Sequence, residues 1–288
     1  MAKNFSNLEV IKAQRNAYGS FFPLNNDTFF LKFVRKILIQ FYKSKWTIFN
    51  FKQTLLKLIF IFLNKKNNKP SDIKFNISSL DSNNKIISEK LKHQGYVFIE
   101  NFFDEETYNS LKNYFPEFYN FKHSMNPLKN YFSSYSFVKD KRMNIPSKSS
   151  NFTYNRLFEF IKSTKFENLF NSFINSDKEY ILHSFMLTYK KENSYLIPHQ
   201  DGTINLKFDN YNFIYFLDGN NRDIFFSAGT GIFKDNEFKK PLMLPTNLKN
   251  SCIIYNTSNL NDFYHGFDIV KKNCFAKVFT IEMSNKEL

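Results

Sequence analysis

The chain has 288 residues, enough for one large domain or for one domain with an extension, and enough to bury a substantial core. Its two cysteines exclude a disulfide framework, and no pairing typical of a cysteine-ligated zinc site is present, so we expect a reducing, cytoplasmic compartment. The 40 Lys and Arg residues against 26 Asp and Glu residues give a net charge of +14, which by itself favours an anionic partner such as nucleic acid, a membrane surface or a phosphorylated substrate. The abundance of Lys, Asn, Phe, Ile and Tyr beside only 7 Gly is what an A/T-rich coding sequence gives, so we treat much of this charge as background.

The N-terminus starts with MAKNFSNLEV and lacks the charged-then-apolar layout of a secretory signal. The most apolar run, residues 55–63, is much shorter than the roughly 18 to 20 residues that a membrane-spanning helix requires. We therefore expect neither a cleaved leader nor a spanning segment.

Two stretches near the N-terminus have helical periodicity. Apolar residues recur three or four positions apart over residues 30–42, and a second run covers residues 48–63. Basic residues punctuate both runs. This pattern is typical either of a basic amphipathic surface for a membrane or of helices that pack on the core or on a second subunit.

The polar stretch 64–72 contains Pro70 and is typical of a linker. We therefore predict a basic amphipathic helical extension over residues 1–70 and a second domain over residues 71–288. In that domain, residues 84–94 have helical periodicity and end at Gly95, a helix stop.

A β-prone run, residues 96–100, and a further helix that opens near residue 103 follow. Residues 121–150 are polar and irregular, so we predict a long loop of the kind that often forms a lid over a substrate. A helix is predicted over residues 154–174. Short strand-like runs separated by turn residues then fill residues 179–285 and indicate a β sandwich or jelly roll.

The octet YLIPHQDG places His199 and Asp201 two positions apart at the end of one such run. On a strand, residues i and i+2 point to one face, so this imidazole and this carboxylate can converge on one metal ion. His265 lies between two later runs and is the candidate for a third ligand. Two imidazoles and one carboxylate form the facial triad that suits non-haem Fe(II), although zinc uses the same ligand types.

A basic residue follows in the last strand-like run, CFAKVFTIEM. Alternation puts Lys277 on one face with Phe275, Phe279 and Ile281, so we predict that it points inward. A buried lysine is costly unless an anion pairs with it, and a bound dicarboxylate would supply that anion.

These residues together resemble the signature of the Fe(II)/2-oxoglutarate-dependent oxygenases. The segment LKHQGYVFIENFFDEETYNSL, residues 91–111, is similar to the opening helix, strand and helix of the phytanoyl-CoA dioxygenase-like and prolyl-hydroxylase-like branches. The resemblance covers residues 85–285. It implies an α+β fold with a double-stranded β-helix core, the cupin-like jelly roll.

The resemblance also implies a set of roles. His199, Asp201 and His265 would hold Fe(II), and 2-oxoglutarate would chelate that iron. Lys277 would pair with the distal carboxylate of 2-oxoglutarate, although many members carry arginine there, and Tyr189 matches a tyrosine that helps to hold this cosubstrate. With O2, such an enzyme hydroxylates a C–H bond, or oxidises it by desaturation or ring closure.

The substrate is expected to be a small molecule, lipid or sugar-linked compound, with an anionic group that basic residues could meet. Two other functions use the same residues: a zinc-dependent hydrolase, and a non-catalytic β-barrel adaptor docked to a membrane or a second copy through residues 30–63. Nucleic acid is not an expected partner.

Overall fold

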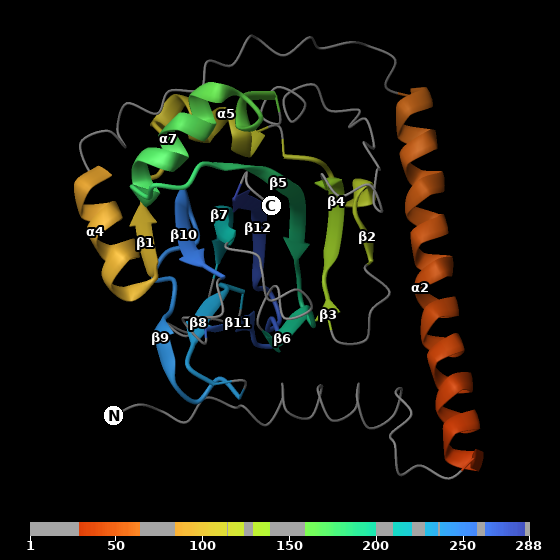
Figure 1. The fold of residues 1–288 in the computed structure, drawn as a ribbon. Helices are drawn as coiled ribbons and strands as arrows, with labels where there is room; N and C mark the ends of the chain where they lie inside the picture. The colour runs from red at the N-terminus through yellow and green to blue at the C-terminus, as the bar shows by residue number, and fades with distance from the viewer. Residues whose placement is uncertain are drawn as a thin grey trace.

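In the computed structural model, a large antiparallel sheet, a smaller sheet and several helices make up a mixed helix-and-sheet fold (Figure 1). The structure describes residues 29–63, 84–113, 115–123, 129–138, 159–199, 210–220, 228–235, 237–257 and 263–285. The predicted linker and the first 28 residues lie outside these ranges.

The strands follow one another along the chain and divide between two sheets. They are β1 (Tyr96–Glu100), β2 (Lys122–His123), β3 (Lys129–Asn130), β4 (Phe132–Val138), β5 (Tyr180–Lys190), β6 (Tyr195–His199), β7 (Asn210–Asn220), β8 (Gly231–Phe233), β9 (Pro241–Met243), β10 (Ser251–Asn256), β11 (Tyr264–Phe267) and β12 (Phe275–Asn285). The large sheet has the order β1-β10-β7-β12-β5-β4-β2, and the small sheet has the order β3-β6-β11-β8-β9. Every pairing is antiparallel.

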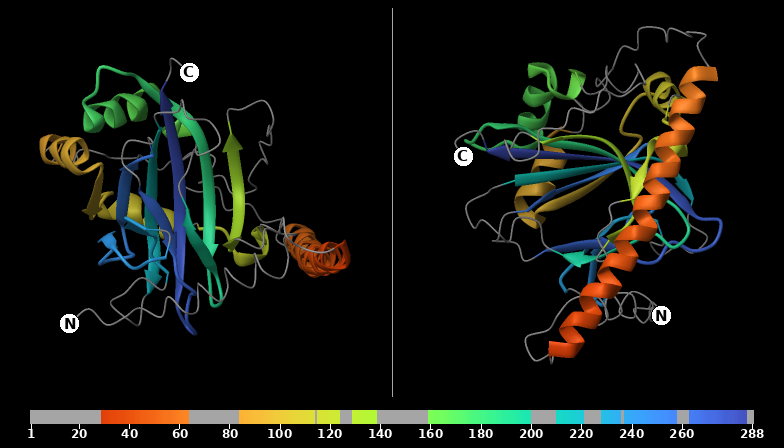
Figure 2. Two further views of the ribbon diagram at one scale, coloured as in Figure 1. Left: turned by 60° about the horizontal axis from the view of Figure 1, so that its bottom comes forward. Right: turned by 90° about the vertical axis from the view of Figure 1, so that its right-hand side faces the viewer.

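Alternate side chains of each strand project to opposite sides of the large sheet, and both of these faces are covered by other elements. The outer face carries Phe185, Tyr215 and Phe279 and packs against three helices, α4 (Asn84–Gln94), α5 (Glu105–Asn113) and α7 (Thr164–Ile174). The inner face, with Phe216 and Val278, packs toward the small sheet. Figure 2 shows the helices on one side of the long strands and the small sheet on the other.

The structure of residues 84–113 confirms the expected local structure. Helix α4 ends at Gln94, and Gly95 takes a φ of 78° while its N–H donates to the Leu91 carbonyl at 2.9 Å. This left-handed conformation favours glycine. Strand β1 follows directly, and Asp104 caps α5 by accepting from the Thr107 N–H at 2.7 Å.

The predicted loop over residues 121–150 is wrong in its first part, where the chain forms β2, β3 and β4. Strand β4 reads FSSYSFV and is held by its ladder with β5, a long-range pairing that a polar local sequence does not reveal. Residues 139–158 lie outside the described ranges, and with them the basic cluster of that loop. Within the helix predicted over residues 154–174, α7 begins at Thr164, after Ser163 accepts a hydrogen bond from the Phe166 N–H.

The two helical runs near the N-terminus form one continuous helix, α2 (Phe29–Leu63). It crosses the edge of the large sheet beside β2, as the right-hand view of Figure 2 shows. Trp46 stacks on His123 of β2 with 3.5 Å between ring centroids. Asn50 exchanges two hydrogen bonds with the backbone of His123, at 2.8 and 3.2 Å. Whether residues 1–70 form a separate extension stays a prediction. None of the described helices combines the length and apolar character needed to cross a bilayer.

Candidate active site

A cavity of about 300 Å³ lies between the two sheets. Its wall is formed by alternate residues of β5, β7 and β12 from the large sheet and by β6 and β11 from the small sheet. His199 and His265 both line it. The cavity is therefore the place where the two sheets bring the predicted metal ligands together.

His199 ends β6 and His265 lies on β11, directly opposite it in the antiparallel register. The centroids of the two imidazole rings are 4.1 Å apart. His199 Nδ1 lies 2.9 Å from the Ile197 carbonyl oxygen, so Nδ1 carries the proton in this contact and the lone pair is on Nε2. A metal-binding histidine is commonly oriented by such a backbone carbonyl, so the pair fits a metal ion.

Gly266 allows β11 to approach β6 this closely. A Cβ atom at this position would lie 2.6 Å from the Leu196 carbonyl oxygen and 3.1 Å from two backbone atoms of Pro198. Any side chain larger than hydrogen would therefore push the two strands apart next to both histidines.

The third predicted ligand, Asp201, lies outside the described residues. Within the described ranges, no three His, Cys, Asp and Glu side chains gather closely enough to hold a metal ion. The structure thus brings two of the three predicted ligands together, and Asp201 as the third stays a prediction.

Lys277 lies on the other face of the large sheet from the cavity. It pairs with Tyr189 in the register of β12 and β5, and its Nζ atom lies 5.2 Å from the Phe115 ring centroid, on the helix-covered side. Lys277 does share a face with Phe279 and Ile281, as expected, but that face is not the cavity wall. The inward placement was wrong because both faces of this sheet are apolar, so apolar neighbours do not distinguish them.

Tyr189 lies on the same face of the sheet as Lys277, and the cosubstrate role that the resemblance implies for it stays a prediction. Its ring packs among aromatic side chains, with centroids 5.2 Å from Phe118 and 5.7 Å from Phe121, and burial raises the pKa of its phenol. It does not line the cavity.

The lysine that does line the cavity is Lys190, the last residue of β5. Only 2% of it is exposed, and its Nζ atom donates to the Thr230 hydroxyl at 2.7 Å and to the Ala228 carbonyl at 3.1 Å. The same Nζ atom lies 4.0 Å from the Phe267 ring centroid. Burial lowers the pKa of this ammonium well below its ordinary value, and no carboxylate of the described residues pairs with it.

Thr188 precedes Lys190 by two positions and faces the same cavity. Its buried hydroxyl has no hydrogen-bond partner among the described residues. A cation and two hydroxyls, those of Thr188 and Thr230, therefore gather on the wall of one cavity. Strand alternation puts Lys190 on the same face as Ser184, Met186 and Thr188, but the sequence does not show which face of the sheet meets the cavity.

No family model and no curated protein matches the sequence. Among solved structures, a prolyl hydroxylase from Trichoplax adhaerens in complex with a hypoxia inducible factor peptide superposes with a TM-score of 0.51 at 10% identity, over 73% of this chain and 93% of that one. An oxidoreductase of the 2OG-Fe(II) oxygenase family from Burkholderia pseudomallei gives 0.49 at 11% identity, over 70% and 90% of the two chains.

The chain shares the fold of the prolyl hydroxylase from Trichoplax adhaerens. The resemblance stated from the sequence is confirmed at this level. At 10% identity the likeness carries the fold and not the residues, so the roles of His199, His265 and Lys190 depend on their own geometry.

Glu282 of β12 is a carboxylate on the cavity wall. Its two oxygens accept from the Ser184 hydroxyl at 3.0 Å and from the Asn210 amide at 2.9 Å. Along β12 it lies six positions from Ala276, the residue that pairs with Lys190. Because a strand rises about 3.3 Å per residue, the backbone positions of Lys190 and Glu282 lie roughly 20 Å apart along the strand direction.

Proposed function

We propose that the chain is an Fe(II)- and 2-oxoglutarate-dependent oxygenase whose two sheets form a double-stranded β-helix, or jelly-roll, core. The observation that carries the proposal is the cross-strand pair of His199 and His265 on the wall of the cavity that also holds Lys190. The fold shared with the Trichoplax prolyl hydroxylase supports it.

His199, His265 and Asp201 would hold the iron. When bound, Fe(II) with 2-oxoglutarate and O2 supplies the oxidising power that inserts oxygen into a C–H bond, with succinate and carbon dioxide as coproducts. The Ile197 carbonyl keeps the His199 proton on Nδ1, which leaves Nε2 for the metal.

Lys190 takes the role that the sequence assigned to Lys277. Burial destabilises the charged form of this lysine when no anion is near it. The distal carboxylate of 2-oxoglutarate would supply that anion. The Thr188 hydroxyl, which has no partner among the described residues, would donate to the same carboxylate. Lysine provides a point charge instead of the two-pronged contact of arginine, and the hydroxyl groups of Thr188 and Thr230 supply the additional directionality.

The substrate in this proposal is a small-molecule, lipid or sugar-linked compound, and the modification is hydroxylation. Apolar side chains on the cavity wall, among them Met186, Ile214 and Val278, would exclude water from the reacting C–H bond.

A zinc hydrolase on the same ligands needs a free general base beside the metal-bound water. Glu282 is the carboxylate among the described cavity-lining residues, and both of its oxygens accept hydrogen bonds from neighbours. This arrangement favours a fixed wall residue over a base, and so favours the oxygenase.

The test is anaerobic binding of Fe(II) and 2-oxoglutarate, followed by succinate production on admitting O2. We expect His199→Ala, His265→Ala and Asp201→Ala to lose both signals while circular dichroism stays unchanged. His93→Ala, on the exposed surface of α4, is the matched control and should retain them. Unchanged succinate production by the Asp201→Ala variant would contradict the proposal.

A further inference from the structure

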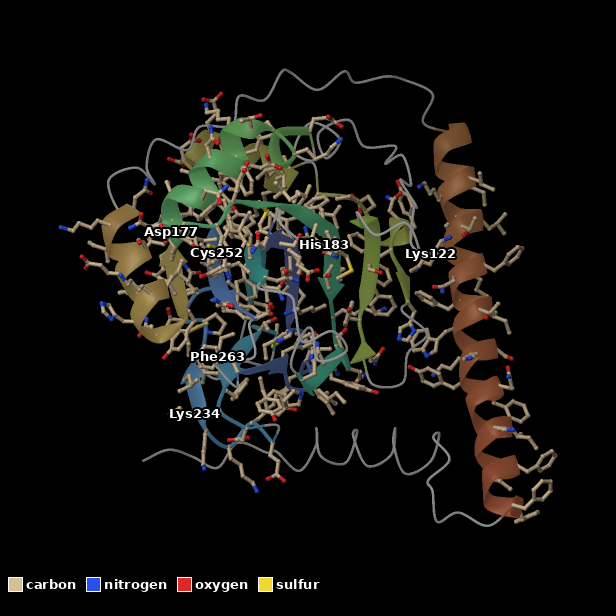
Figure 3. All side chains as sticks on the ribbon, in the orientation of Figure 1. Lys122, Asp177, His183, Lys234, Cys252 and Phe263 are labelled. Carbon is tan, nitrogen blue, oxygen red and sulfur yellow. The ribbon has the colours of Figure 1, made fainter. Side chains whose placement is uncertain are left out.

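Helix α2 carries an exposed apolar surface on the side away from the sheets. Of the twelve large hydrophobic side chains that are exposed among the described residues, eleven belong to α2, and the twelfth is Ile86. Figure 3 shows the side chains of α2 that project from its outer side. Contiguous exposed apolar surface of this kind marks an interaction site.

The exposed residues fall on one side of the helix. Six of them are spaced three, four or seven residues apart, and an α-helix places residues at this spacing on one face. This row, hereafter the outer face, is Phe33, Ile37, Phe41, Ile48, Phe51 and Leu55. Phe41 is 70% exposed and Phe51 is 68% exposed.

The opposite side of α2 is the one that docks on the domain. On this side Trp46 stacks on His123, and Asn50 makes two hydrogen bonds with the His123 backbone. Gln53, on the same side of the helix, is buried. Trp46 and Ile48 are two positions apart, which separates their directions by about 200° at 3.6 residues per turn. The domain contact therefore presents the outer face to the surroundings.

Exposed lysines flank the outer face on both sides. Lys36 and Lys43, seven residues apart, lie along one edge, and Lys45 and Lys52, also seven apart, lie along the other. The 35 residues of α2 include seven basic residues and no acidic one. An apolar stripe between two lysine rows matches a helix that lies in the interface of an anionic bilayer, with its apolar side chains in the acyl region and its lysines at the headgroups.

We propose that the outer face of α2 is a docking surface for an anionic lipid bilayer. A second copy of the chain fits this surface less well, because two such helices would bring seven positive charges each together with no acidic residue to pair with them. The proposal stands on α2 alone and is independent of the oxygenase chemistry.

The test is sedimentation of the full chain with vesicles of phosphatidylcholine containing phosphatidylserine, compared with pure phosphatidylcholine. We expect binding to the anionic vesicles that weakens as salt is raised, since the lysine contribution is screened. Lys43→Gln with Lys52→Gln should lower the partition coefficient roughly tenfold or more, because each lysine contributes its own attraction to the anionic headgroups. Phe41→Ser with Phe51→Ser should lower it at least as much, through the lost apolar burial.

The matched controls lie on α4. Ile86→Ser removes the exposed apolar side chain outside α2, and Lys90→Gln with Lys92→Gln removes two exposed lysines, so both should bind as the unchanged chain does. Circular dichroism and the fluorescence of Trp46 confirm that each variant keeps α2 docked. Equal binding to neutral vesicles, or variants that bind as the unchanged chain does, would overturn the proposal. A dimer that the phenylalanine variant converts to monomer, with no vesicle binding, would also overturn it and assign the surface to a second copy.

Discussion

The ammonium group of Lys190 donates a 2.7 Å hydrogen bond to the Thr230 hydroxyl inside the cavity that His199 and His265 line. The two residues come from β5 and from the segment that leads into β8, 40 positions apart. This contact places a cation in the cavity without a carboxylate partner among the described residues, and the first prediction tests it.

Lys190→Met should raise the KM for 2-oxoglutarate by roughly 30-fold or more, the cost of removing one member of a buried charge pair. The same variant should keep its fold, because removal of a buried ammonium offsets the loss of its hydrogen bonds to Thr230 and Ala228. Lys277→Met is the matched control on the opposite face of the sheet, and its KM should stay near the original value. A large rise in KM for Lys277→Met, with none for Lys190→Met, would return the role to Lys277.

Gly266→Ala should lower the free energy of unfolding by about 1–3 kcal/mol, since its Cβ would lie 2.6 Å from the Leu196 carbonyl oxygen. Because the displaced strands carry both histidines, Fe(II) affinity should fall by roughly tenfold or more. Gly219→Ala has a comparable clash, at 2.8 Å from the Phe275 carbonyl, in the large sheet. It should lose stability and keep its metal affinity. Calorimetry of unfolding and of Fe(II) binding separates the two effects, and equal metal affinity in the Gly266→Ala variant and the unchanged chain would argue against the histidine pair as ligands.

His123 should make the docking of α2 sensitive to acid. Burial, opposed by the hydrogen bond with Asn130 and assisted by nearby Lys45, lowers its pKa from 6.5 to about 4. Between pH 6.5 and 4 the unfolded chain therefore binds a proton that the folded chain does not. Stability is full above pH 6.5 and falls as the pH drops toward 4, by roughly 1–3 kcal/mol after allowance for solvent screening.

Trp46 gives a direct measurement of this effect. It is the only tryptophan of the chain and stacks on His123, so its fluorescence reports the contact between α2 and β2. We expect the emission of the unchanged chain to change over a window centred near pH 4, where His123 of the folded chain takes up its proton. His123→Phe keeps an aromatic partner without a titrating group, and its emission should be flat over that window. Identical profiles for the two chains would refute the assignment.

The outcomes at the site show what a single sequence can and cannot determine. The pairing of His199 with His265 follows from strand periodicity and a metal-ligand inventory, both of which are local properties. The choice between Lys190 and Lys277 depends on which face of a doubly buried sheet meets the cavity, and that is set by long-range packing of the helices. Asp201 remains a prediction, because it lies outside the described residues.

The same contrast holds for the fold. The boundaries of α4 and β1 could be predicted because Gly95 and the β-prone run after it are local signals. Strands β3 and β4 could not, because their ladders pair them with β6 and β5, about 50 to 70 positions further along the chain. Strand β2 pairs with β4 and so depends on the same long-range ladder. The sequence predicted two helical runs where the structure has the single helix α2, because the residues in the middle of this helix are polar and exposed.

Asn250 should be a main determinant of stability. Its side-chain oxygen accepts from the Phe103 N–H and from the Tyr215 hydroxyl, each at 2.9 Å, and its amide donates to the Phe103 carbonyl at 2.7 Å. Its backbone φ of 47° is also tolerated better by asparagine than by alanine. Asn250→Ala strands three buried polar groups, so the free energy of unfolding should fall by about 3 kcal/mol or more. Asn247→Ala removes one exposed turn contact, to the Lys249 N–H, and should cost under about 1 kcal/mol. Urea unfolding of both variants gives the comparison, and a loss for Asn250→Ala no greater than that for Asn247→Ala would show that the buried network contributes little.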